Sequence, residues 1–193
     1  MQRLKRKIIS CGDKGMTLVE TLVAVSIFLL VMAAIMQMFV SAVRLERSFL
    51  AKSESMSEAS YLMEYISRAV RMAKKDALNL CGNGVNANFG QPSGIGTSLS
   101  FLMYNGTMCQ EFYKQGTALY EKKVAGGNTI INALTSSALE VAAFNVAGLG
   151  WYGAGVGDYD QPRVTVSLQL KDKTQSSFIL QTTVSQRNPD LGR

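Results

Sequence analysis

An uncharged apolar run near the N-terminus constrains this chain more than any other feature. Thr21 to Val43 gives 23 consecutive residues without a charge. At about 1.5 Å per residue, a helix of this length crosses a bilayer core of about 30 Å. A secretory signal is the alternative, but the apolar part exceeds the usual core of about 7–15 residues and no A-x-A cleavage pattern follows it. The run therefore predicts a transmembrane helix over residues 16–43.

The positive charge of the chain is concentrated before this run. The net charge is +6, from 20 basic and 14 acidic residues. The leader, residues 1–15, has a net charge of +4 from Arg3, Lys5, Arg6, Lys7 and Lys14 against Asp13. Lys and Arg beside a membrane span mark its cytoplasmic side, so the N-terminus is expected inside and the rest outside. The remainder has a net charge of only +2, and nucleic acid is an unlikely partner.

The apolar pattern becomes one-sided after the membrane run. Apolar residues recur at spacings of three, four or seven, which is typical of an amphipathic helix. They are Leu45, Phe49, Met56, Ala59, Met63, Ile66, Val70, Ala73 and Ala77. With no proline between Met16 and Leu78, one helix is predicted from Met16 to about Leu78, with residues 44–78 as the amphipathic continuation.

The remaining residues, 79–193, are expected to form a β-rich domain. Strands are predicted at residues 98–104, 129–134, 163–171 and 176–186, with a hairpin over 109–123 that turns at Gln115-Gly116. Residues 139–151 are ambiguous between strand and helix. The expected fold class is α+β, with the outer half of the helix packed on one antiparallel sheet of roughly five to seven strands.

The three cysteines divide between two redox environments. Cys11 lies in the cytoplasmic leader, where thiols stay reduced. Cys81 and Cys109 fall in the exported part, and two cysteines there most simply form one disulfide, with two free thiols as the alternative. Such a bridge contributes roughly 3 kcal/mol in the chain-entropy estimate.

Little in the sequence points to catalysis or to a cofactor. The chain has no histidine, which excludes His-based triads and His-ligated metal sites. No enzyme activity and no small-molecule substrate are expected. Asp158 and Asp160 form a weak calcium candidate in a glycine-rich loop, but calcium takes about six to eight oxygen ligands and a solvated turn is the favoured interpretation. Trp151, Tyr152 and Tyr159 near this loop suit core packing better than a partner surface.

A short motif stands where the leader meets the apolar run. Its sequence, KGMTLVE, runs from Lys14 to Glu20. A basic leader, this motif and the long apolar helix together resemble the processing site of type IV prepilins and type II secretion pseudopilins, over about the first 45 residues. The resemblance implies a pilin-like fold, cleavage between Gly15 and Met16 by a prepilin peptidase, and methylation of the new amine of Met16.

Glu20 is the one charge left at the start of the apolar segment. A lone carboxylate in hydrocarbon costs several kcal/mol unless it is paired. The family resemblance implies that this glutamate meets the α-amine of an adjacent subunit and sets the assembly register. A position at the headgroup level, with no partner, is the alternative. Major pilins often carry a helix-kinking proline midway along the helix, where this chain has Gln37, either bonded between helices or simply tolerated.

The function expected from the resemblance is that of a structural subunit. It would be a single-pass protein of the bacterial cytoplasmic membrane that assembles into a type IV pilus or pseudopilus. A minor, initiating component is favoured, and the implied partners are other pilins, an assembly platform protein and an ATPase. The alternatives are a major structural pilin and a non-polymerising, membrane-anchored adhesin or binding module. Adhesion, DNA uptake and protein secretion all remain open as the process served.

Overall fold

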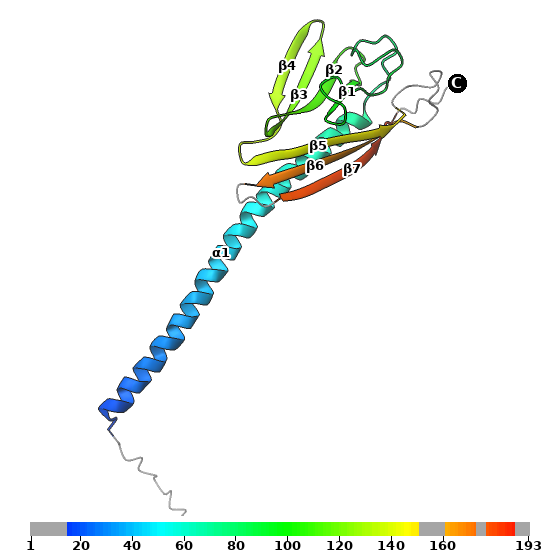
Figure 1. Ribbon diagram of the computed structural model, residues 1–193. Helices are drawn as coiled ribbons and strands as arrows, with labels where there is room; N and C mark the ends of the chain where they lie inside the picture. Colours follow the sequence, from blue (N-terminus) through cyan, green and yellow to red (C-terminus); the bar gives the residue numbers. More distant parts are fainter. Residues whose placement is uncertain (1–14, 151–160, 173–176, 188–193) are drawn as a thin grey trace, which may run out of the picture. The chain divides into compact units, whose positions relative to one another are not determined.

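The computed structural model describes residues 15–150, 161–172 and 177–187 (Figure 1). The chain forms two compact units, Met1–Leu50 and Ala51–Arg193. One long helix precedes strands that pair only with antiparallel neighbours, so the predicted α+β, pilin-like class is confirmed. The elements are α1 (Leu18–Arg71), β1 (Ser98–Leu102), β2 (Cys109–Gln115), β3 (Ala118–Ala125), β4 (Asn128–Ala133), β5 (Leu139–Leu149), β6 (Arg163–Asp172) and β7 (Ser177–Ser185).

The outer part of α1 supplies one side of the core of the second unit. Ala59, Leu62, Met63, Ile66 and Val70 are its buried residues, and their spacing places them on one helical face. They pack in a single apolar cluster with buried residues of both β-sheets. The middle of the predicted stripe is therefore confirmed, but Leu45, Phe49 and Met56 stay exposed, and Ala77 is exposed and lies beyond the helix.

α1 ends at Arg71, seven residues before the predicted end at Leu78. The backbone leaves the helix because later amides find other partners. The N–H of Lys74 donates to the carbonyl of Leu102 at 2.9 Å, and the N–H of Asp76 donates to that of Ala87 at 2.8 Å. These non-local bonds replace the helical ones, so Ala73 is buried without belonging to the helix.

The end of α1 is tied to the C-terminal part of the chain. The N–H of Arg187 donates to the carbonyl of Arg71 at 2.9 Å. The buried side chain of Gln186 donates from Nε2 to the carbonyl of Ala73 at 2.6 Å. Carbonyls at a helix end have no partner within the helix, so these bonds satisfy groups that would otherwise be left unpaired.

The strands form two sheets, and the prediction of one sheet is wrong. The first has the order β1-β2-β3-β4 and the second the order β5-β6-β7. β5, a strand and not a helix, turns its outer edge toward loops of the first sheet. The N–H groups of Val141 and Val146 donate to the carbonyls of Thr117 and Gly96, both at 2.8 Å. Because β5 bonds to these loops instead of to β1 or β4, the two sheets remain separate while sharing one core.

Two tight turns set the register of the first sheet. Gln115 pairs with Ala118, so the β2–β3 turn consists of residues 116–117, one position later than predicted. Ala125 pairs with Asn128, and the intervening Gly126 and Gly127 have φ values of +54° and +87°. Two positive φ values define a type I′ turn, which suits glycine and matches the twist of a hairpin.

A buried polar cluster joins α1 to β2 and β3. The hydroxyl of Tyr65 and the Nε2 of Gln110 both donate to Oε1 of Glu121, each at 2.5 Å. The Nζ of Lys123 donates to Oε2 of Glu121 at 2.9 Å. Burial, with the bond to Glu121, raises the pKa of Tyr65. Burial alone would lower the pKa of Lys123, but its bonds to Glu121 and Tyr65 outweigh this and raise it. The buried carboxylate is thus fully supported, which makes the cluster an anchor between helix and sheet.

Cys81 and Cys109 form a disulfide in the second unit. Their Sγ atoms are 2.02 Å apart and their Cα atoms 5.4 Å apart. Cys81 follows the helix end, where its amide donates to Oδ2 of Asp76 at 2.7 Å, and Cys109 begins β2. The bridge therefore holds the irregular segment after α1 to the first sheet.

Removing the Tyr65 hydroxyl is expected to loosen the helix anchor. We predict that Tyr65→Phe lowers the free energy of unfolding by roughly 1–2 kcal/mol, because a hydrogen bond to a charged group is lost. Thermal unfolding of the full chain in detergent measures the change. Tyr61→Phe is the matched control, since Tyr61 is 75% exposed on the same helix and should behave as wild type.

The same cluster predicts a loss of stability at alkaline pH. Raised folded pKa values mean that the stability contributed by Tyr65 and Lys123 is present below pH 10.0, the ordinary value for tyrosine, and is lost as the pH rises through the raised values. The Tyr65→Phe variant should therefore lose less of its free energy of unfolding than the wild type as the pH rises through this range. Identical alkaline profiles for the variant and the wild type would contradict the assignment.

Loss of the disulfide is expected to destabilise the second unit. We predict that replacing Cys81 and Cys109 by serine lowers the free energy of unfolding by roughly 3 kcal/mol, because the unfolded chain regains the freedom of the closed loop. Unfolding of the double variant beside Cys11→Ser, which should match wild type, provides the test. Alkylation of both thiols before any reduction would show instead that the bridge does not form in the native protein.

Candidate functional site

The candidate site is the start of α1, with Gly15, Met16 and Glu20. Gly15, Met16 and Thr17 are exposed and non-helical, and α1 begins at Leu18 (Figure 1). A Cβ added at Gly15 would meet no heavy atom within 4 Å, and its φ lies outside the left-handed region. Within the described part of the chain, nothing therefore requires glycine at position 15. A requirement for glycine there has to come from a partner that binds this backbone.

Thr17 caps the first turn of the helix. Its Oγ1 accepts from the N–H of Glu20 at 3.3 Å, and its carbonyl accepts from the N–H groups of Glu20 and Thr21 at 3.1 and 3.2 Å. Thr17 and Glu20 have the Thr-x-x-Glu spacing of a capping box. Neither the processing motif nor the charge pattern identifies Thr17 as a helix cap. The Thr-x-x-Glu spacing in the sequence does indicate that role. The cap lies one residue after Met16 and the helix begins at Leu18, so cleavage after Gly15 would leave α1 complete.

Glu20 has an acidic side chain in the first turn of α1. A negative charge is favourable at this end, where the helix dipole is positive and backbone N–H groups lack helical partners. Glu20 is exposed, and no ion pair joins it to any described residue. Within the described part of one chain, the carboxylate thus lacks a cation, and a low-dielectric setting would have to supply one from elsewhere.

The residues after Glu20 present apolar side chains on every side of the helix. Large apolar residues from Leu18 to Val40 are exposed in the chain alone. α1 is long and apolar enough to cross a membrane, and it is the one helix among the described residues that meets this test. Gln37 is exposed in the same stretch. An apolar surface on all sides is typical of a helix that lipid or other helices surround.

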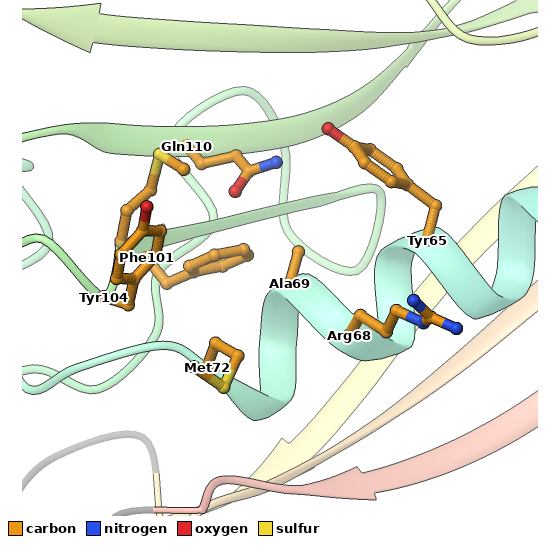
Figure 2. A pocket seen from close by; sticks show the side chains of 8 residues that line it. Tyr65, Arg68, Ala69, Met72, Phe101, Tyr104 and Gln110 are labelled. Atoms are coloured by element: carbon orange, nitrogen blue, oxygen red, sulfur yellow. The ribbon is translucent and has the colours of Figure 1, made fainter.

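A mainly apolar groove in the second unit lies beside α1. Its volume is about 360 Å³. Figure 2 shows residues that line it: Tyr65, Arg68 and Ala69 on the helix, Met72 just after the helix end, and Phe101, Tyr104 and Gln110 on the first sheet and its loop. Arg68 is bound to Glu64 of the same helix at 2.6 Å. The groove brings together no nucleophile and base, and the described residues contain no group of three or more potential metal ligands. Its shape suits packing more than chemistry.

The weak calcium candidate falls outside the described residues. Asp158 and Asp160 lie in the segment 151–160, as do Trp151, Tyr152 and Tyr159, so the interpretation of that loop stays a prediction.

One comparison with known proteins bears directly on the start of α1. A family model described as the prokaryotic N-terminal methylation motif matches residues 11–36. No curated protein and no solved structure matches the chain. The matched segment contains Gly15, Met16 and Glu20, together with much of the apolar part of α1. This match, on a long apolar helix that precedes antiparallel β-sheets, supports the resemblance of the N-terminal segment to prepilin-type pilins and pseudopilins.

Proposed function

We propose that the chain is a prepilin-like structural subunit, cleaved after Gly15 and assembled through the start of α1 into a type IV pilus or pseudopilus as a minor, initiating component. The observation that carries the proposal is Glu20. It is a charged residue at the start of an exposed apolar helix, inside a methylation motif, with no cation among the described residues of its own chain. Assembly with other pilins supplies what the single chain lacks.

Cleavage would create the missing cation. Cutting the Gly15–Met16 bond leaves a positively charged α-amine on Met16, and methylation at nitrogen preserves that charge. In an assembly of staggered helices, the amine of one subunit would lie beside Glu20 of its neighbour. The pairing turns a costly buried charge into a device that fixes the register between helices.

The minor role rests on other features than the assembly itself. Gln37 stands where major pilins often carry a kinking proline. The β-rich part is large for the chain and includes the long irregular segment between α1 and β1. Glu20 is present, although one class of tip pseudopilin typically lacks this glutamate, which disfavours that class. A major pilin and a non-polymerising adhesin are the alternatives that the tests below separate.

The proposed location follows from the leader and the helix. The basic leader would stay in the cytoplasm, α1 would cross the inner membrane before assembly, and the β domain would lie outside. A prepilin peptidase, an assembly platform protein and an ATPase are the proposed partners. No cofactor is proposed.

Processing is the first test of this function. When the chain is co-expressed with an active prepilin peptidase, we expect a product that begins at Met16 and carries a methyl group, as read by mass spectrometry of the N-terminus. Gly15→Val should abolish this product without changing the fold, because the structure leaves open space at Gly15. Gly12→Val, within the leader, is the matched control. An intact N-terminus beside an active peptidase would favour the membrane-anchored adhesin.

Charge removal at Glu20 tests the assembly step separately. Glu20→Gln keeps the size of the side chain but cannot pair with the α-amine, and losing one partner of a buried pair costs roughly 3–5 kcal/mol. We expect normal processing and a fall of more than about a hundredfold in incorporation into filaments. Glu46→Gln, an exposed acidic site on the same helix, should incorporate normally. Immunoblots of sheared filament fractions measure both, and normal incorporation of Glu20→Gln would refute the pairing.

A further inference from the structure

The two sheets have four outer edges, and two of them are covered by the chain itself. The edge of β1 bonds to Lys74 and Gly90, whose N–H groups donate to the carbonyls of Leu102 and Ser100 at 2.9 and 2.8 Å. The edge of β5 donates to the loop carbonyls of Thr117 and Gly96. The remaining outer edges are those of β4 and β7, one in each sheet.

Among the described residues, β4 and β7 lack the features that usually protect an exposed edge. Neither strand contains a charged residue or a proline, and every residue of β4 is exposed. Ile130, Ile131 and Ile179 are 55%, 53% and 64% exposed. Edge strands of soluble proteins are normally shielded from other chains by lysine, proline, bulges or a covering segment. These two strands are therefore built in a way that permits pairing with another chain.

The free edge of β4 offers a regular row of backbone groups. The two-residue turn at Gly126 and Gly127 makes Ala125 and Asn128 a hydrogen-bonded pair. Bonded and non-bonded pairs alternate along an antiparallel ladder, so Thr129, Ile131 and Ala133 direct their N–H and C=O groups away from β3. An extended strand is the kind of partner that satisfies such a row.

We propose that β4 of one subunit pairs with β7 of a second copy of this chain. In Figure 1, β5 and β6 lie between β4 and β7, so the two free edges belong to different sides of the β domain. Contact between unlike edges is head-to-tail and can propagate, whereas β4 against β4 would close a dimer around a two-fold axis. A filament with a direction requires the first kind. Neither strand is charged, so the contact brings no like charges together.

This contact deepens the proposed function, on which it rests, by naming the neighbour. An initiating complex would contain at least two adjacent copies, joined by a continuous sheet outside the membrane as well as by their helices. The pairing also covers apolar surface, because Ile130 and Ile131 on β4 and the half-buried Phe178 and Leu180 on β7 gain a neighbouring strand.

Cross-linking between two distinguishable copies tests the contact. Two full-length chains with different tags, both carrying Cys11→Ser, are co-expressed with prepilin peptidase. One carries Ile130→Cys or Ile131→Cys on β4, and the other carries cysteine at Ile179, Gln181 or Thr183, exposed positions on β7. We expect a disulfide-linked product bearing both tags for at least one combination, since cross-strand Cβ atoms lie about 4.5–5.5 Å apart. Each single variant expressed alone should give no linked product.

Two further variants separate strand pairing from chance collision. Ser137→Cys, exposed but outside the strands, should give no linked product with any β7 position. Adding Thr129→Lys to the linking β4 variant should abolish the product, because a charge is placed on the edge. Absence of the two-tag product from every combination, or its replacement by β4–β4 or β7–β7 products, would overturn the proposal.

The N-terminal mass of each sample keeps this result apart from the proposed function. Processed chains that give no two-tag product defeat the strand contact and leave the filament role standing. Chains that keep their leader but still form the two-tag product defeat the filament role and support the strand contact between membrane-anchored copies.

Discussion

Burial of the apolar surface of α1 is the constraint on which the rest of the structure depends. Residues 51–71 meet it within the chain, because Leu62, Ile66 and Val70 lie against buried residues of both sheets. Residues 18–40 do not, since their large apolar side chains stay exposed. One helix therefore combines a completed interface with an incomplete one. The first makes a stable β domain, and the second requires lipid or the helices of other subunits.

In the proposed assembly, Glu20 would give the incomplete interface its direction and register. Apolar packing alone would allow one helix to slide along another, because each shift in register replaces one apolar contact with a similar one. A buried carboxylate that needs a cation allows few positions. Thr17 sets the position of the first helical turn and so fixes where Glu20 stands relative to the end of the processed chain. The cap and the charge thus act together.

Local pattern was enough to predict the helical stripe, the apolar span and most strands, because spacing in the sequence reports which side is buried. Local pattern gave the wrong prediction where hydrogen bonds to residues far along the chain determine the structure. α1 stops at Arg71 because Lys74 bonds to Leu102, far along the chain. The division into two sheets depends on β5 bonding to Thr117 and Gly96, which no local pattern indicates. At the candidate site, the motif identified Gly15, Met16 and Glu20 as positions, whereas the cap at Thr17 required the geometry of the first turn.

The bonds from Gln186 and Arg187 back to the end of α1 have a consequence for biosynthesis. The carbonyls of Arg71 and Ala73 receive these partners only once Gln186 and Arg187 have been synthesised. The second unit can therefore complete its fold only after β6 and β7, which precede Gln186 in the chain, are also available. A chain that stopped before Gln186 would leave the carbonyls of Arg71 and Ala73 without these partners.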